Sequence, residues 1–462
     1  MERILLFGAG KNLEKYINDI IEFGEVVIVG IVDSDENKWG KQIRGITIQS
    51  LDDICDEYDY VIITCYCACE IEDYLVESKG ICRDKIKRIK EYVGNHSNGK
   101  WLEYHPEKIK RLDQDLKSVH SVAIIVPYGE FNGACLAALY LLMGLQSMGY
   151  LVGFVAAGAD ESFISYVLDR NIDLCIYSNI EFTSYESFTW IHKFHHIIVN
   201  TLSAHKCIVN LRYDNILWWI HESDFSYQYE IKLWNQFEEN QYNNAKIYCV
   251  SQKAIRTFHR YFPTLKADCL EYGLPDFWTN SETKKDGKIV VAIIGRVSYE
   301  KGQDLLINAI ESMDESLVAK ITVWVVGKIS KDNYCDELKQ ESQKLPVKFL
   351  GELSHEDIAK LYKKIDILVN ASRQDSLPIV VAEAFMNKKI VIASNAIGTM
   401  DYIEDGKNAY VFNSDSEDDL RINLENVIAN FDKLDQIRNA AREVYLNHFS
   451  LESLKTRIKS VL

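Results

Sequence analysis

The chain has 462 residues, of which 47% are hydrophobic and 26% are charged, and its formal net charge is −16. This length predicts two or three domains, and the composition is that of an ordinary globular protein. The acidic balance argues against non-specific nucleic-acid binding, because a phosphate backbone would be repelled. It leaves room for a local basic surface that contacts a membrane.

The apolar runs, cysteines and first residues limit the class further. The longest apolar run, residues 135–145, is too short to span a bilayer. The chain starts with a predicted strand and not with a signal peptide, so we expect a cytoplasmic protein, with peripheral contact at the inner face of the membrane as an option. The cysteines lack a paired spacing and are expected to be reduced. Packing explains the cluster at Cys65, Cys67 and Cys69 more simply than a metal site does.

Residues 1–92 have the pattern of a small Rossmann-like domain. Gly8 and Gly10 separate a predicted strand from a predicted helix, and Asp33 ends the next strand. A glycine turn and an acid about 20 residues later suit the phosphates and the ribose of a nucleotide. We therefore predict a nucleotide-like site at these three residues. Leu13 replaces the third glycine of the dinucleotide fingerprint, which argues against nicotinamide chemistry.

The segment that follows Asp33 resembles the small domain that precedes sugar acyltransferases and some glycosyltransferases. The resemblance leaves two roles open for this domain, namely binding of a nucleotide or nucleotide-sugar, and assembly into an oligomer. Residues 93–119 are polar and charged, which predicts a linker with one short helix. Its lysines form either a solvated helix face or a contact with anionic lipid.

From residue 120 to about 275, strands and helices alternate, which predicts a parallel sheet with helices on both faces. Gly133 lies between a buried strand and a helix, where glycine allows the backbone to approach a ligand. His221 ends another strand, at the edge where open α/β sheets place ligands. We predict a functional role for His221 and structural roles for His195 and His196.

A third α/β run occupies residues 276–445. After its first strand, Gly295 and Arg296 lead into a loop that reaches Lys301 before the next helix. A guanidinium fork and a compact ammonium near a helix N-terminus suit the charge of a diphosphate. The alternating pattern predicts strands across the chain at residues 26–32, 122–126, 151–156, 196–200, 289–294 and 321–326.

The stretch from residue 372 to 394 predicts a strand end, a polar turn, a helix from about Pro378, and another strand. Such a turn presents backbone N–H groups to an anion. Asp375 and Ser376 lie where a helix cap is expected. Glu383 is an acid in an otherwise apolar helix, so it either caps another group or holds a ligand hydroxyl.

These motifs together resemble retaining glycosyltransferases of family 4. The run Ser-Arg-x-Asp-x-x-Pro-x-Val-x-x-Glu-Ala, from residue 372, is similar to the family's acid-x7-Glu signature. Residues 295–302 are similar to its Gly-Arg-Leu-x-x-x-Lys-Gly motif. The common family form has Glu at the place of Asp375 and glycine at the places of Asn132 and Thr399.

The resemblance covers residues 120–462 and implies an α/β structure of GT-B fold, in which two Rossmann-like domains face a cleft. The acceptor-side domain would be residues 120–275 and the donor-side domain residues 276–445. Residues 446–462 would form a helix that crosses back to the acceptor side. The small domain of residues 1–92 precedes these two as a third Rossmann-like unit.

The resemblance also implies transfer of a sugar from a nucleotide-diphosphate sugar to a glycan or glycolipid acceptor, without a metal or other cofactor. Glu383 would hold the ribose and Asp375 the donor sugar, while His221 would orient the sugar. The catalytic set is thus His221, Arg296, Lys301, Asp375 and Glu383, and the donor-binding set is Gly133, Gly295, Arg296, Lys301, Leu377, Ile379 and Glu383. The departures from the motifs leave a second hypothesis open, a non-catalytic GT-B scaffold or partner subunit.

Overall fold

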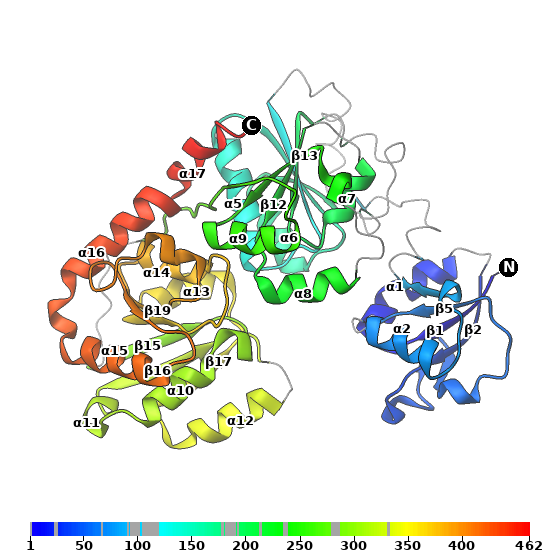
Figure 1. Ribbon diagram of the computed structural model, residues 1–462, viewed down its shortest axis with the longest axis horizontal. Coiled ribbons are helices and arrows are strands. Elements are labelled where there is room, and N and C mark those ends of the chain that lie inside the picture. Colours follow the sequence, from blue (N-terminus) through cyan, green and yellow to red (C-terminus); the bar gives the residue numbers. More distant parts are fainter. Residues whose placement is uncertain are drawn as a thin grey trace.

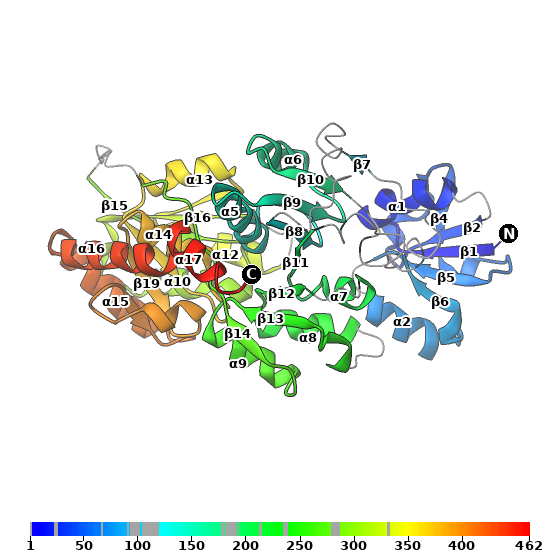
Figure 2. The same ribbon diagram turned by 90° about the horizontal axis from the view of Figure 1, so that it is seen from above.

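The computed structural model describes residues 2–22, 26–65, 68–89, 92, 102–103, 120–176, 180, 191, 194–211, 215–233, 239–278, 287–329 and 333–462. Three β-sheets lie at the centres of three α/β bodies (Figures 1 and 2). In the described parts of the chain, no helix has the combination of length and apolar composition that a bilayer span requires.

The first body is a six-stranded sheet in the order β3-β4-β2-β1-β5-β6. Its central strand β1 pairs in parallel with β2 and with β5, and apolar residues pack on both faces of the sheet. The strands are β1 (Glu2–Phe7), β2 (Val26–Val32), β3 (Gln42–Ile43), β4 (Ile46–Gln49), β5 (Tyr60–Ile63) and β6 (Ile86–Arg88), and the helices are α1 (Lys11–Glu22) and α2 (Ala68–Glu77).

The second body is an eight-stranded sheet in the order β14-β13-β12-β11-β8-β9-β10-β7. Its strands are β7 (Leu102–Glu103), β8 (Ser121–Val126), β9 (Leu151–Ala156), β10 (Asp173–Ile176), β11 (His196–Asn200), β12 (Ile216–Ile220), β13 (Ala245–Cys249) and β14 (Ala267–Cys269). Its helices are α5 (Gly133–Ser147), α6 (Glu161–Leu168), α7 (His205–Leu211), α8 (Asp224–Leu233) and α9 (Gln252–Tyr261). Only β7 runs antiparallel among these strands, and it joins part of the predicted linker to this sheet.

The third body is a six-stranded parallel sheet in the order β17-β16-β15-β18-β19-β20. Its strands are β15 (Ile289–Ile294), β16 (Ile321–Val326), β17 (Val347–Gly351), β18 (Ile367–Asn370), β19 (Ile390–Ser394) and β20 (Tyr410–Phe412). Its helices are α10 (Gln303–Glu311), α11 (Glu315–Val318), α12 (Asn333–Glu341), α13 (His355–Tyr362), α14 (Ile379–Met386), α15 (Glu417–Ala429) and α16 (Asp435–Val444).

The second and third bodies share one continuous apolar core, and the end of the chain ties them together. Helices α16 and α17 (Leu451–Ile458) run from the third body back to the second, in red in Figure 1. Leu274 donates its N–H to Phe449 and accepts the N–H of Leu451. Helix α17 packs on α5 at Gly144, where an added Cβ would lie 3.2 Å from Leu451 Cδ1.

A close backbone approach in the third body makes Gly302 a sensitive position. Its φ is +71°, and an added Cβ would lie 2.1 Å from the carbonyl oxygen of Ala371, whereas Gly351, with φ +72°, has open space. Left-handed geometry alone costs alanine about 1 kcal/mol, and the clash at Gly302 should add roughly 1–3 kcal/mol. Denaturant unfolding should therefore rank Gly302→Ala clearly below Gly351→Ala. Equal stability of the two variants would contradict the close approach.

Candidate functional site

The predicted donor-site residues gather at one edge of the third sheet. Strands β15, β18 and β19 are neighbours and parallel, so the loops after their carboxyl ends meet, which is where open α/β sheets bind ligands. Backbone hydrogen bonds join these loops: Arg373 N–H donates to the Glu300 carbonyl at 2.8 Å, and Gly398 N–H donates to the Asp375 carbonyl at 3.0 Å.

Lys301 and Asp375 form an ion pair across two of these loops, with 2.6 Å between Nζ and Oδ2. The prediction that Asp375 and Ser376 cap the following helix is wrong. Helix α14 begins at Ile379 with Pro378 at the cap position and no side-chain cap bond. The tertiary partner takes the Asp375 carboxylate instead, because an opposite charge at this distance holds it more strongly than a backbone N–H does.

The two predicted basic residues differ in how they are held. Burial acts to lower the pKa of Lys301, but Asp375 outweighs burial and raises that pKa above its usual value. Lys301 therefore stays charged. Arg296 is exposed, and in the described part of the chain its guanidinium has no ion-pair partner. It is close enough to Lys301 to oppose the charge there.

Arg373 anchors the Lys301 loop, a role that the sequence analysis missed. Its guanidinium donates to both carboxylate oxygens of Asp304, at 3.0 and 2.7 Å, and to the Tyr299 carbonyl at 2.6 Å. It also pairs with Asp415 at 2.7 Å and lies 3.8 Å from the centroid of the Tyr299 ring. The sequence could have indicated this role, because Arg373 belongs to the acid-x7-Glu run and lies two residues before Asp375, the acid that pairs with Lys301.

Glu383 lies inside α14 with only 8% of its surface exposed. Burial raises the pKa of its carboxyl to about 7, although a hydrogen bond from Tyr362 opposes that rise. The Tyr362 hydroxyl lies 3.0 Å from Glu383 Oε2 and 3.0 Å from the Val380 carbonyl oxygen. Tyr362 is therefore a protein partner of one carboxylate oxygen, and the role of Glu383 in holding a ligand hydroxyl stays a prediction.

Several buried oxygens at this edge have no protein partner among the described residues. They share a position in the loops after β15, β18 and β19, or at the end of β18. They are Ser298 Oγ, Asn370 Oδ1, Gln374 Oε1, Ser376 Oγ and Thr399 Oγ1. Because buried polar groups are nearly always hydrogen-bonded, this concentration favours a polar ligand or ordered water at the edge.

The second body faces these loops. An added Cβ on Gly133 would lie 3.9 Å from Ile379 Cγ2, so the glycine turn and the start of α14 meet. Leu377, two residues before Ile379, is buried. Ser251 Oγ donates to the Ser376 carbonyl at 2.6 Å. The structure thus brings predicted residues of both bodies to one site.

His221 directly follows β12 in the second body and lies near the Lys301 loop. Ser223, two residues later, is 3.4 Å from Glu300 Oε1. Burial lowers the pKa of His221 to about 3, so the ring is neutral at neutral pH. Its Nε2 lies 2.9 Å from Asn200 Oδ1, a partner that the sequence analysis did not anticipate.

In the first body, Asp33 is bonded within its own domain. Its Oδ2 accepts the N–H of Ala9 at 2.6 Å and pairs with Lys38 at 2.8 Å. Burial raises the pKa of Asp33, but these bonds outweigh burial and leave it below its usual value. Gly8 has φ +109°, and Gly10 has open space beside it. The Asp33 carboxylate therefore binds the backbone of the glycine turn in its own domain.

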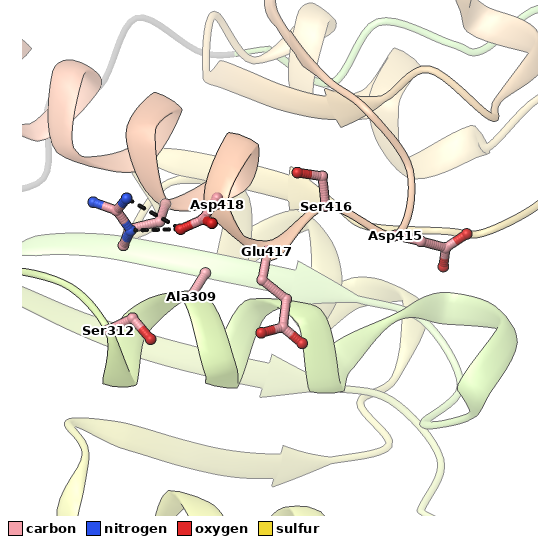
Figure 3. Close-up of a pocket in the computed structure, with 7 residues that line it drawn as sticks. Ala309, Ser312, Asp415, Ser416, Glu417 and Asp418 are labelled. Carbon is pink, nitrogen blue, oxygen red and sulfur yellow. Dashed lines mark hydrogen bonds and ion pairs between the residues drawn. The ribbon is translucent and has the colours of Figure 1, made fainter.

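A hollow of about 470 Å³ lies elsewhere on the third body, between α10 and α15 (Figure 3). Its lining includes three acidic residues and one arginine, so it does not suit a diphosphate. Its residues are Ala309, Ser312, Asp415, Ser416, Glu417, Asp418 and Arg421. Within the described ranges, no group of three or more His, Cys, Asp or Glu side chains is arranged to hold a metal ion. Cys67 of the predicted cluster lies outside the described residues.

Comparison with known structures identifies the fold. The chain matches Anabaena Alr3699/HepE in complex with UDP and glucose, with a TM-score of 0.62 and 18% identity over 74% of this chain and 99% of that one. The match to WaaG, a glycosyltransferase involved in lipopolysaccharide biosynthesis, has a TM-score of 0.54 and 16% identity over 74% and 99% of the two chains. The fold is that of GT-B glycosyltransferases. This confirms the predicted fold class.

A match to a sequence-family model is consistent with the GT-B fold for the third body. Residues 276–444 match the family model for glycosyl transferases group 1, and residues 1–87 match a model described as C2185-like, N-terminal. The Bacillus subtilis (strain 168) spore coat protein SA is 27% identical over 204 residues, 40% of this chain and 54% of that protein.

Another relative carries a more specific name. The D-inositol 3-phosphate glycosyltransferase of Corynebacterium aurimucosum is 25% identical over 178 residues, 37% of this chain and 42% of that protein. The chain spans between 35% and 54% of the length of the curated relatives it matches.

The buried Glu383 predicts a pH-dependent stability difference. Its pKa rises from 4.5 unfolded to about 7 folded, so the folded state binds the proton more tightly. Wild-type stability should therefore fall as pH rises through this window, by on the order of 3 kcal/mol. Glu383→Gln cannot ionise, so it should gain stability over wild type from about pH 5 to pH 8. Denaturant unfolding across that range tests this, with exposed Glu311→Gln as control. A parallel pH profile for Glu383→Gln and wild type would contradict the assignment.

Proposed function

We propose that this protein is a retaining glycosyltransferase that moves a sugar from a nucleotide-diphosphate sugar to a glycan or glycolipid acceptor. The observation that carries the proposal is the Lys301–Asp375 ion pair at one sheet edge, with Arg296 close to Lys301. Glu383 lies in the helix that follows the Asp375 loop, and Tyr272 is close enough to both Asp375 and Glu383 to sense their charges. Gly133 faces that edge from the second body. Cations beside hydroxyl-binding acids suit a ligand that is charged at its bridge and rich in hydroxyls elsewhere.

Similar structures support the donor class. Anabaena HepE has structures with UDP and with UDP-glucose, and its fold is shared by this chain. WaaG takes part in lipopolysaccharide biosynthesis by its description. A bacterial surface glycan or glycolipid is therefore the acceptor class we propose. The reaction would take place on the cytoplasmic side of the membrane.

Each site residue has a distinct task in this reaction. Lys301 and Arg296 neutralise the diphosphate as its bond to the sugar breaks, which requires no metal ion. Asp375 holds sugar hydroxyls and Glu383 holds the ribose. His221, neutral at working pH, orients the sugar beside its anomeric carbon.

The bond to the acceptor forms on the face from which the diphosphate leaves, so the sugar keeps its anomeric configuration. The acceptor hydroxyl gives its proton to a departing diphosphate oxygen, and no protein nucleophile is needed. The catalytic contribution of the protein is then positioning and charge stabilisation in a closed cleft.

The activity is tested by incubating the full chain with a panel of nucleotide sugars, with and without candidate acceptors. Release of nucleoside diphosphate that depends on one donor supports the proposal, and NMR of the product's anomeric signal tests retention. Donor binding without release, for every donor and acceptor, would favour the scaffold hypothesis. That hypothesis draws on the motif departures at Asn132, Asp375 and Thr399, and the first body would then serve assembly.

Removal of the cations should slow the chemical step. Arg296→Ala and Lys301→Ala should each lower kcat by about 10²- to 10³-fold, because each removes charge stabilisation of the leaving diphosphate. Steady-state kinetics measures this, with Lys320→Ala at the opposite end of the sheet as control. Arg296 is exposed, so its variant should keep the wild-type Tm. Unchanged turnover in either variant would contradict these roles.

A further inference from the structure

A chain of hydrogen bonds crosses the carboxyl ends of three neighbouring strands in the second body. The strands lie in the order β12-β11-β8. His221 follows β12, Asn200 is the last residue of β11, and the glycine turn with Ala134 follows β8. Asn200 is fully buried between the other two. Its amide nitrogen lies 3.2 Å from the Ala134 carbonyl oxygen, and its Oδ1 lies 2.9 Å from His221 Nε2.

The chemistry of these groups determines where the protons lie. The Ala134 carbonyl can only accept a hydrogen bond, so the NH₂ group of the Asn200 amide must face it. The amide oxygen then faces His221 Nε2, and an oxygen can only accept. His221 Nε2 must therefore carry a hydrogen.

We propose that Asn200 is a positioning residue that fixes His221 as the Nε2–H tautomer, which leaves Nδ1 as the only acceptor on the ring. This inference rests on the proposed function only for its catalytic consequence. A ring held in this way orients a sugar by accepting a hydroxyl hydrogen at Nδ1. It also links His221 to the glycine turn that faces Ile379.

The backbone around Asn200 holds the amide in place. Thr201, the next residue, has φ +78°, a conformation that is strained for a β-branched residue and that persists only where the surroundings enforce it. Its N–H donates to the Trp219 carbonyl, and its carbonyl accepts from Trp218 Nε1, both at 2.8 Å.

Glu222 adds a second tie between the two strand ends. Its carboxylate accepts the N–H of Leu202 at 2.8 Å and the N–H of His221 at 2.9 Å. Glu222 is a titratable group next to the His221 ring. The Trp219 ring packs against the His221 ring, with 4.6 Å between their centroids. The loops that carry Asn200 and His221 are therefore joined independently of the amide.

The tautomer is measured directly by ¹⁵N–¹H correlation of the imidazole rings in the full chain labelled with ¹⁵N-histidine. The chain has 11 histidines, and His221 is assigned by the signals that His221→Gln removes. We expect a protonated Nε2 and an unprotonated Nδ1 at pH 7. A protonated Nδ1 in the wild-type protein, alone or as the major form, would overturn the proposal.

Asn200→Asp is the matched change, because it keeps the shape but replaces the NH₂ group by oxygen. A carboxylate beside the ring favours the doubly protonated imidazolium, so both ring nitrogens of His221 should be protonated at neutral pH. Asn215→Asp is the control, since Asn215 donates to the His195 carbonyl at the other end of β12, and His221 should keep its wild-type signals.

Kinetics separates this inference from the proposed function. With a donor that supports turnover, Asn200→Asp should lower kcat by on the order of 10- to 100-fold and add a pH dependence that the Asn215→Asp control lacks. If the spectra agree but no donor is turned over, the proposed function fails and the tautomer assignment stands. If turnover occurs but the wild-type ring carries its hydrogen on Nδ1, the function stands and this inference fails.

Discussion

The ion pair between Lys301 and Asp375 joins two loops that are 74 positions apart in the chain, and the arrangement of the site depends on it. The pair places an ammonium and a carboxylate at the meeting point of β15, β18 and β19. Without Asp375, only the weaker effect of Glu300 would oppose the lowering of the Lys301 pKa by burial. Arg373 bonds to Asp304 and to the Tyr299 carbonyl, on either side of Lys301 in the chain. These bonds restrict movement of the Lys301 loop away from Asp375.

The ionisable groups around this pair divide into charged and neutral ones. Asp375 holds Lys301 in its charged form, and exposed Arg296 adds a positive charge that has no ion-pair partner among the described residues. Burial instead keeps His221 neutral and raises the pKa of Glu383 to about 7. Lys301 and Arg296 therefore supply positive charge at the site, while His221 and Glu383 act as hydrogen-bond partners. This division suits a ligand with a charged bridge between two hydroxyl-rich parts.

The site depends on two bodies, and the end of the chain holds them together. Helix α17 packs on α5, which starts at the same glycine turn that faces Ile379. Asn200 connects that turn to His221 through its amide. A change in how the second body packs against the third would therefore move the glycine turn and the histidine together relative to the donor-side loops.

The sequence by itself determined the alternation of strands and helices and the residues at the strand ends. The predicted strands at residues 26–32, 151–156, 196–200, 289–294 and 321–326 coincide with β2, β9, β11, β15 and β16, because buried parallel strands are continuous apolar runs between turn residues. Lys301 and Asp375 lie in loops that leave the neighbouring strands β15 and β18, and Glu383 lies in the helix that follows the second of these loops. Only the tertiary structure decided which groups bond to one another. Asp375 pairs with Lys301 and does not cap the following helix. Asp33 accepts a hydrogen bond from the backbone of its own glycine turn. Asn200 and Arg373 bond to residues that lie far away in the chain. Local patterns record periodicity and turn chemistry, whereas such partners depend on strand order, which periodicity does not encode.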